Sequence, residues 1–218
     1  MGLVTRGRIA ALVAILGVAA GFSAAAFAKQ ADGVTLVARP TEAGPGQGVT
    51  LFGTAEGARA GESIDIQAKD CGQATFHTAG GAHVGAGGEW QTEFFPGINT
   101  ALRAVWRGNV SRTITLRQRA SLRLEPHPAN PKRFEVAIAA KASFWRKQVL
   151  FQRLAGVWKT VRPVRLTESA APPGATYVWS RAQFRTTLPR GTRVRVLLPQ
   201  AAANPCYVSA ASRLLRVG

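Results

Sequence analysis

The residues best suited to chemistry in this sequence are one cysteine and two histidines in the spacing C-x5-H-x5-H. Cys71, His77 and His83 follow Asp70, and all four are residue types that bind zinc. Metal sites usually have shorter spacings, and every ligand must be deprotonated and converge on one point. The spacing therefore favours solvated loop histidines over a metal site, and we expect neither a metal nor a cofactor.

Sequence signatures of catalysis are missing as well. No serine lies in a G-x-S-x-G turn, and no H-E-x-x-H motif occurs. Glycoside hydrolysis needs paired carboxylates, and these are scarce after residue 118. The acidic residues there are Glu125, Glu135 and Glu168. We therefore expect a protein that is not an enzyme.

Positive charge is the sharpest chemical feature of the sequence. The chain has 28 Lys and Arg against 11 Asp and Glu, a formal net charge of +17. Residues 29–117 contain 8 basic and 8 acidic residues, whereas residues 118–218 contain 18 basic and 3 acidic ones. Clustered arginines repel one another at low salt, and a polyanion relieves this repulsion by counterion release. The second half is therefore predicted to contact an anionic partner.

Alternation along the expected strands places several of these arginines on the solvent side. Arg193 and Arg195 alternate with valines, and Arg123 lies between two leucines. The alternative is that arginine only makes the surface soluble, or reflects a coding preference, although the neutral first half argues against a preference. The predicted anion-binding residues are Arg123, Arg146, Lys147, Arg162, Arg165, Arg181, Arg185, Arg193 and Arg195.

The two cysteines, Cys71 and Cys206, fall one in each half of the chain. An even cysteine count in an exported protein predicts a disulfide, and two free thiols are the alternative. The bond would close a loop of about 135 residues, which the chain-entropy model values at about 4–5 kcal/mol.

Residues 1–28 have the pattern of a secretory signal peptide. A basic start at Arg6 and Arg8 precedes an apolar core, and Ala26-Phe27-Ala28 fits a cleavage site. An uncleaved anchor is the alternative, because residues 9–28 are almost wholly apolar and a span needs about 20 residues. The many alanines and glycines disfavour an anchor. We predict a secreted or extracytoplasmic protein with no membrane span after cleavage.

The elements that must position these residues are short strands. Between Gly88 and Arg117 the sequence GEWQTEFFPGINTALRAVWRGNVSRTITLR alternates apolar and polar residues, breaks at Pro96-Gly97 and turns at Gly108-Asn109. Such alternation is typical of half-buried strands, and Gly-Asn is a hairpin signal. For that reason we interpret Asn109-Val110-Ser111 as a turn rather than a glycosylation site. Helix signals are nearly absent after the leader.

A degenerate copy of this pattern occurs in the second half. Phe134, Val136 and Ile138 match Val49, Leu51 and Gly53 at an offset of 85 residues, and later strands match at offsets of 90 and 92. The offset grows only across turns, where insertions are tolerated. The sequence thus predicts two β-sandwiches, residues 29–118 and residues 119–218, after the signal peptide of residues 1–28.

The paired strand–turn–strand ends, residues 88–117 and their counterpart from Phe184 to Val217, resemble the tandem immunoglobulin-like or fibronectin type III-like modules of secreted bacterial proteins. The sequence departs from antibody domains, because each half has only one cysteine. The resemblance implies binding, spacing or adhesion by an exported protein. It implies no particular ligand.

Together these features predict a monomeric, non-enzymatic module of the cell envelope, in which the basic second half contacts an anionic envelope polymer. The alternative is a structural or adhesion module that docks another envelope protein and binds no polyanion. A carbohydrate-binding module is a further alternative, because Trp145, Trp158 and Trp179 could stack on sugars, although such residues more often pack at a core. The exported address disfavours nucleic acid as the partner, and no further membrane span is expected.

Overall fold

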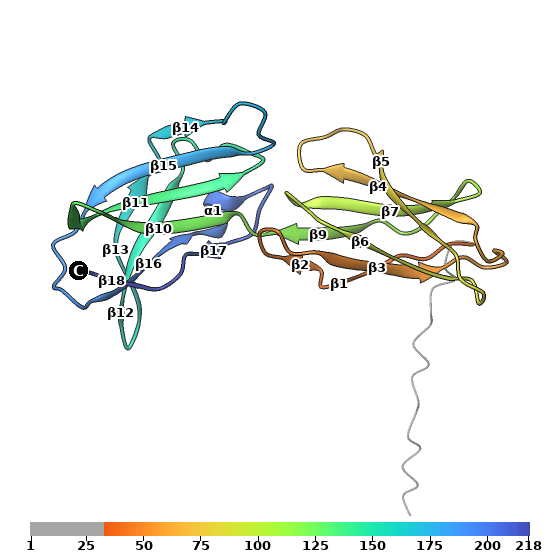
Figure 1. Cartoon of the computed structure of the whole chain (residues 1–218), viewed down its shortest axis with the longest axis horizontal. Coiled ribbons are helices and arrows are strands. Elements are labelled where there is room, and N and C mark those ends of the chain that lie inside the picture. Colours follow the sequence, from red (N-terminus) through yellow and green to blue (C-terminus); the bar gives the residue numbers. More distant parts are fainter. Residues whose placement is uncertain (1–32) are drawn as a thin grey trace, which may run out of the picture. The chain divides into compact units, whose positions relative to one another are not determined.

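Strands make up almost all of the regular structure in residues 33–218, which are the residues that the computed structural model describes (Figure 1). This confirms the predicted all-β class. The predicted leader, residues 1–28, lies outside the described residues. No helix in residues 33–218 is long and apolar enough to cross a membrane.

The strands before residue 119 form two sheets around one hydrophobic core. One sheet has the order β1–β3–β6 and the other β2–β9–β7–β4–β5, with β8 paired to β7. Alternate residues point inward, so Leu51 of one sheet and Ile66 and Leu102 of the other are buried in the same core. The strands are β1 (Val37–Arg39), β2 (Glu42–Ala43), β3 (Val49–Thr54), β4 (Ser63–Asp70), β5 (His77–His83), β6 (Glu89–Phe94), β7 (Thr100–Trp106), β8 (Asn109–Val110) and β9 (Ile114–Gln118).

The strands after residue 119 form a second pair of sheets around a second core. The orders are β10–β11–β15–β14 and β13–β12–β16–β17, with β18 paired to β16. Phe134 and Phe184 of one sheet pack against Phe151 of the other. The elements are β10 (Ser121–His127), β11 (Asn130–Ala140), β12 (Gln148–Ala155), β13 (Val157–Arg165), β14 (Glu168–Ala170), β15 (Val178–Arg185), β16 (Arg193–Leu198), α1 (Gln200–Ala203), β17 (Ala210–Ala211) and β18 (Leu215–Arg216).

The two halves pair their strands in the same register. Val49 lies opposite Phe94 in the first half, as Phe134 lies opposite Phe184 in the second. A β-bulge follows Ile66 on β4, and a bulge follows the matching residue on β12, Phe151. The residues that the sequence matches by spacing are therefore paired alike in the structure.

A buried serine occupies the same place in each half and was not singled out by the sequence pattern. The hydroxyl of Ser111 accepts a hydrogen bond from the backbone N–H of Ala104 at 2.9 Å, and that of Ser212 accepts one from Val196 at 3.0 Å. Each hydroxyl also donates to the carbonyl of the following arginine, at 3.0 Å in both halves. Each serine therefore satisfies a backbone donor where the last hairpin leaves the sheet.

The last hairpin is where the two halves differ most in length. In the first half Trp106 lies opposite Asn109, so the central turn residues are Arg107 and Gly108. The predicted turn at Gly108-Asn109 was therefore wrong by one residue, because Arg107 and Gly108 both adopt positive φ, as a type I′ turn requires. In the second half Leu198 lies opposite Ala210, and the intervening Pro199–Ser209 contains α1.

Candidate functional site

Basic residues concentrate at one end of the second half, where they oppose each other across neighbouring strands. Arg133 lies opposite Arg185, and Arg193 lies opposite Arg216. A third basic pair, Arg153 and Lys159, lies across the β12–β13 hairpin. We call these residues, with two neighbours, the arginine end: Lys132, Arg133, Arg153, Lys159, Arg185, Arg190, Arg193 and Arg216. Like charges directly opposite one another destabilise a strand pair, so this arrangement weakens the fold locally.

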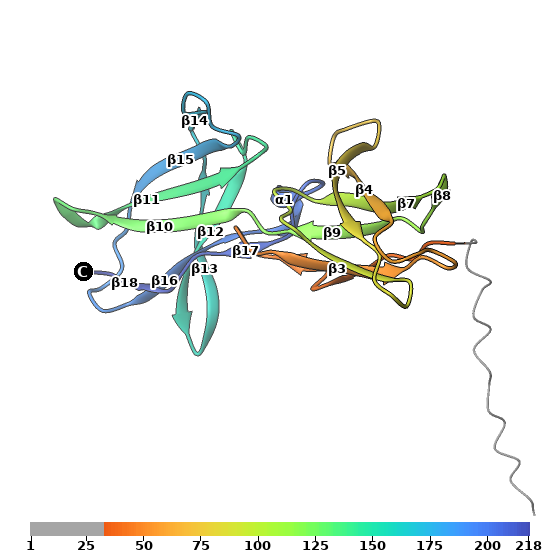
Figure 2. The ribbon, with the colours of Figure 1, turned by 45° about the vertical axis from the view of Figure 1, so that its right-hand side comes forward.

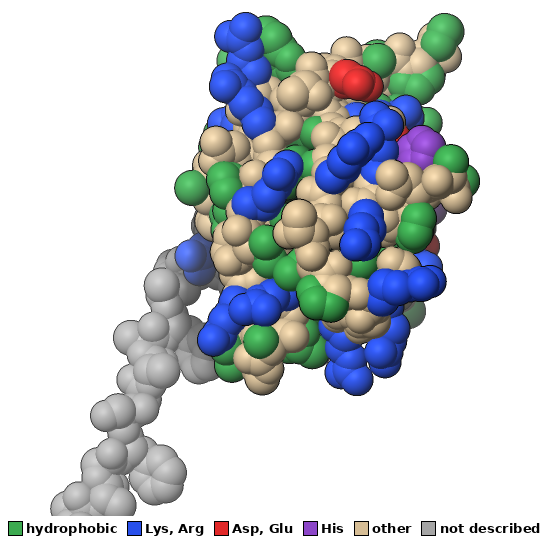
Figure 3. All heavy atoms as spheres, turned by 90° about the vertical axis from the view of Figure 1, so that its left-hand side faces the viewer, with side chains coloured by type: hydrophobic (Ala, Val, Ile, Leu, Met, Phe, Trp, Pro, Cys, Tyr) green, Lys and Arg blue, Asp and Glu red, His purple; other side chains and the backbone are tan. Residues whose placement is uncertain are grey.

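Hydrogen bonds of the loop between β15 and β16 hold the arginine end together. The N–H of Thr186 donates to the carbonyl of Lys132 at 2.9 Å, and the N–H of Gly191 donates to that of Val217 at 2.7 Å. The loop, which carries Arg190, is thereby tied to the start of β11 and to the end of the chain. Figure 3 views the second half from this end and shows separate Lys and Arg side chains spread across the face, with little acidic surface between them.

Acidic residues of the second half lie on one of its two sheets only. Glu125, Glu135 and Glu168 belong to β10, β11 and β14. Within the described residues, the strands of the sheet β13–β12–β16–β17 and of β18 carry no acidic residue. Two of the three basic pairs, those of Arg153 and Arg193, lie on this acid-free sheet, so no carboxylate of their own sheet offsets them.

The same positions in the first half carry no Lys or Arg in two of the three pairs. The register equates β7 with β16 and β4 with β12, so each basic pair of the second half has a counterpart. The first-half pairs at the positions of Arg153–Lys159 and Arg193–Arg216 are Ala68–His77 and Ala101–Thr115. The arginine end is therefore specific to the second half.

Arg195, one of the predicted anion-binding residues, is held in place by its own neighbours. Its Nε donates to Oε1 of Gln152 at 2.9 Å, and its guanidinium lies 4.1 Å from the ring centre of Trp158. Partial burial lowers the pKa of Arg195 from its ordinary value, although a guanidinium stays charged near neutral pH. The first half has the same arrangement, in which Arg103 donates to Gln67 at 2.8 Å. Arg195 is thus part of the shared framework of the two halves.

Arg123 and Arg181 form a separate group on the outer face of the other sheet. They flank Ala137 of β11, and their guanidinium carbons lie 5.9 and 5.1 Å from the ring centre of Trp179. Arg181 also lies 3.9 Å from Glu135 and opposite Glu168 in the sheet. Carboxylates therefore offset much of the charge of this group.

The remaining predicted residues lie elsewhere in the second half. Arg146 and Lys147 follow β11 in the turn before β12, and Arg146 stacks on Trp145 at 4.0 Å. Arg165 lies opposite Gln148 at the other end of β13 from Lys159, and Arg162 lies over the ring of Phe184 at 5.4 Å. Of the nine predicted residues, the arginine end brings together Arg185 and Arg193.

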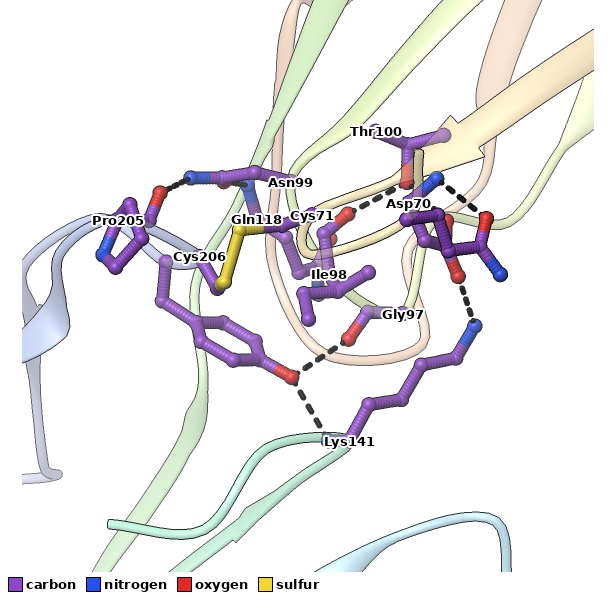
Figure 4. Close-up of a disulfide and its surroundings, with 12 residues drawn as sticks. Asp70, Cys71, Gly97, Ile98, Asn99, Thr100, Gln118, Lys141, Pro205 and Cys206 are labelled. Carbon is purple, nitrogen blue, oxygen red and sulfur yellow. Dashed lines mark hydrogen bonds and ion pairs between the residues drawn. A yellow bond between two sulfur atoms is a disulfide. The ribbon is translucent and has the colours of Figure 1, made fainter. Parts of the chain in front are cut away.

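The predicted disulfide between Cys71 and Cys206 is present and confirms that expectation (Figure 4). Cys71 follows β4 in the first half, and Cys206 lies in the long turn that contains α1. Asn99 lies beside the bond and joins the same two segments. Its N–H donates to the carbonyl of Cys206 at 2.9 Å, and its side-chain amide donates to that of Pro205 at 2.8 Å.

Tyr207 extends this junction into the second core. The ring is buried, and its hydroxyl donates to the carbonyl of Gly97 at 3.0 Å while accepting from the N–H of Lys141 at 2.8 Å (Figure 4). Burial raises the pKa of the Tyr207 hydroxyl. Lys141 Nζ also pairs with Asp70 at 2.9 Å. The long turn therefore supplies the covalent bond and several of the polar contacts between the halves, and Lys141 and Asp70 add an ion pair from outside it.

The histidines considered as metal ligands do not converge. His77 and His83 lie at the two ends of β5 and are both exposed. Cys71 is bonded to Cys206, so its sulfur is not a free thiolate. Both histidines are exposed, but the prediction of loop histidines was wrong, because they belong to β5 and pair with residues of β4.

The predicted anion-binding residues leave out six of the eight residues of the arginine end, among them Arg133 and Arg216, and sequence reasoning also missed Tyr207. Arg216 ends the two-residue strand β18, where alternation is too short to show, and alternation does not reveal that Arg133 lies opposite Arg185. Tyr207 lies in a turn without a counterpart in the first half, so no sequence pattern predicts its contact with that half. No family model matches the chain, and a search of the curated proteins finds no match either.

Proposed function

We propose that this protein is an exported, non-enzymatic binding or spacer module of the cell envelope, built from two tandem immunoglobulin-like sandwiches. Two observations support the proposal. Each half has one core between two sheets, with equal strand register, and a disulfide, which suits an oxidising compartment, joins the halves.

The arginine end of the second half contacts an anionic polymer of the envelope. The observation that carries this proposal is the set of three basic pairs placed directly opposite one another, two of them on a sheet without a carboxylate. Such pairs cost stability unless an anion neutralises them. A polyanion supplies closely spaced negative charge and gains free energy from released counterions.

Binding of dextran sulfate, a soluble anionic polymer, tests this proposal. Both cores are formed by residues between 34 and 217, so residues 29–218 contain the folded part. We expect the affinity to fall steeply as salt rises. Replacing Arg193→Gln and Arg216→Gln should lower the affinity about tenfold or more at low salt, since each basic contact with an anionic surface is worth roughly 1 kcal/mol.

The matched control is Arg112→Gln with Arg117→Gln, which removes the same charge from the first half. An equal loss in both double variants would mean that net charge alone drives binding, and would contradict a site at the arginine end. Binding of dextran sulfate that does not depend on salt, or no binding at all, would contradict the proposal.

A second candidate is a structural module that docks another envelope protein without binding a polyanion. The bonded junction of Cys71, Asn99 and Tyr207 favours it, because a spacer benefits from a fixed connection between its parts. A partner captured at high salt, by wild type and by the Arg193→Gln, Arg216→Gln variant alike, would favour this candidate over the polymer contact.

A further inference from the structure

The β12–β13 hairpin reaches beyond the core that it belongs to. Its buried residues end at Gln152 and resume at Val164. Between them only Leu154 and Trp158 are partly covered. In Figures 1 and 2 the hairpin extends past the neighbouring strands at the lower edge of the second half. Residues 154–159 lie beyond the last pair with β16 and pair only within the hairpin, so they form a projection that packing within this chain does not explain.

The tip of this hairpin is wholly apolar. Residues 154–158, which we call the tip, read Leu-Ala-Gly-Val-Trp, and Gly156 takes the positive φ of the turn. Leu154 pairs with Trp158, and Ala155 pairs with Val157. Val157 is 65% exposed, the highest value among the exposed large hydrophobic residues of the described chain. An apolar group raised into solvent in this way marks a surface that contacts something else.

Basic residues surround the tip without a carboxylate on the same sheet. Arg153 and Lys159 immediately flank it and lie opposite one another. The guanidinium of Arg195 covers one face of the Trp158 ring at 4.1 Å. A shallow hollow lined by Arg153, Leu154, Gly156, Gly191, Thr192 and Arg193 joins the tip to the arginine end. The tip is thus an apolar projection surrounded by basic residues.

We propose that the tip inserts into the surface of an anionic lipid bilayer while the arginine end holds the headgroups. The inference goes beyond the polymer contact but rests on the proposed function, because it uses the same basic end. A soluble polyanion leaves Val157 in water, whereas the boundary between headgroups and acyl chains accepts apolar side chains. Peripheral binding strengthens with the apolar area buried and with attraction to anionic lipid. Long basic side chains keep their charge at headgroup level while their stems lie along the apolar layer.

Cosedimentation of residues 29–218 with lipid vesicles tests the inference. The vesicles are phosphatidylcholine alone, and phosphatidylcholine mixed with phosphatidylglycerol. Wild type should bind the mixed vesicles and not the neutral ones. Val157→Ser, which changes no charge, should lower binding to mixed vesicles at least about tenfold, the factor that corresponds to burying one valine side chain, and should leave the affinity for dextran sulfate within about twofold.

The matched control is Val110→Ser, which makes the same neutral change at an exposed valine of the first-half hairpin, where Val110 is 39% exposed. It should bind both probes as wild type does. Thermal unfolding of each variant confirms that it is folded.

The outcomes separate the two proposals. If Val157→Ser binds mixed vesicles like wild type, or if wild type binds dextran sulfate but no vesicles, the tip inference is overturned and the polymer contact stands. If wild type binds neutral vesicles as well as mixed ones, the role of the basic residues around the tip is overturned. If wild type binds neither dextran sulfate nor mixed vesicles at low salt, the proposed function itself fails.

Discussion

The sheet β4–β5–β7–β9 of the first half and the sheet β12–β13–β16–β18 of the second share one framework and differ in what they show to solvent. Both have the bulge, the buried serine and the arginine that bonds glutamine and stacks on an aromatic ring. On the outer face, Asp65 and Lys69 of the first half correspond to Leu150 and Leu154 of the second. Ala101 and Thr115 correspond to Arg193 and Arg216.

This difference shows that one set of residues specifies the fold and another set specifies the chemistry of the surface. The shared residues satisfy backbone donors and fix the register, so they are tied to the fold. The outer residues replace a mixed-charge face with one that is apolar and cationic, and no requirement of the framework explains that change. The experiments below test each side of the comparison.

The largest effect should come from the bond that joins the two halves. Replacing Cys71→Ser and Cys206→Ser should lower the free energy of unfolding by about 4–5 kcal/mol, because the bond closes a loop with a sequence separation of 135. Urea denaturation measures the change, and wild type under reducing conditions should match the variant. An unchanged midpoint would show that the noncovalent contacts of Asn99 and Tyr207 suffice.

The shared framework predicts equal losses at equivalent serines. Ser111→Ala and Ser212→Ala should each lower the free energy of unfolding by about 1–3 kcal/mol, because each leaves a buried backbone N–H without an acceptor. Ser63→Ala, at the exposed first residue of β4, is the control and should change little. A loss at one site only would break the equivalence of the two hairpins.

The basic pair on β16 and β18 should be costly to the fold. Arg193→Gln with Arg216→Gln should raise the free energy of unfolding by about 0.2–1 kcal/mol at low salt, since it removes two like charges that face each other. The reciprocal change in the first half, Ala101→Arg with Thr115→Arg, should lower it by a similar amount. Denaturant titrations measure both changes. Changes of opposite sign in the free energy of unfolding support the difference between the two halves, and a lower stability of the Arg193→Gln, Arg216→Gln variant contradicts it.

The smallest effect concerns a carboxylate that only the first half has. The indole N–H of Trp106 donates to Glu62 at 2.8 Å, and this bond is the main reason why the pKa of Glu62 lies below its ordinary value. The resulting stabilisation is present above the pKa of the unfolded chain, about 4.3, and is lost as pH falls through the lower folded-state pKa.

Glu62→Gln should therefore show a slightly smaller drop in melting temperature between pH 6 and pH 3 than wild type does. Glu56→Gln, at an exposed glutamate, is the control. An equal drop in wild type and Glu62→Gln would mean that the bond from Trp106 adds nothing measurable.

Alternation and spacing predict the all-β class, the main strands and the matched register, because a strand with one buried face must keep its parity. They do not predict the arginine end. Alternation shows that Arg193 faces outward, but it does not show that Arg216 lies opposite it across another strand. The turn error at Arg107 has a related cause, since a Gly-Asn signal marks a hairpin without fixing which residues are central. Tyr207 depends on a tertiary contact that no local pattern records.

Ile98 has a consequence for assembly. This first-half residue is buried and belongs to the second hydrophobic core, so the first half fills part of the core of the second. The register of β7 and β16 places Arg190 at the equivalent position of the second half. Arg190 is charged and exposed, so it cannot fill the core of another copy in this way. The basic pairs around it also repel an identical surface. We therefore expect this end of the protein to disfavour head-to-tail growth into open filaments, the hazard of any heterologous interface.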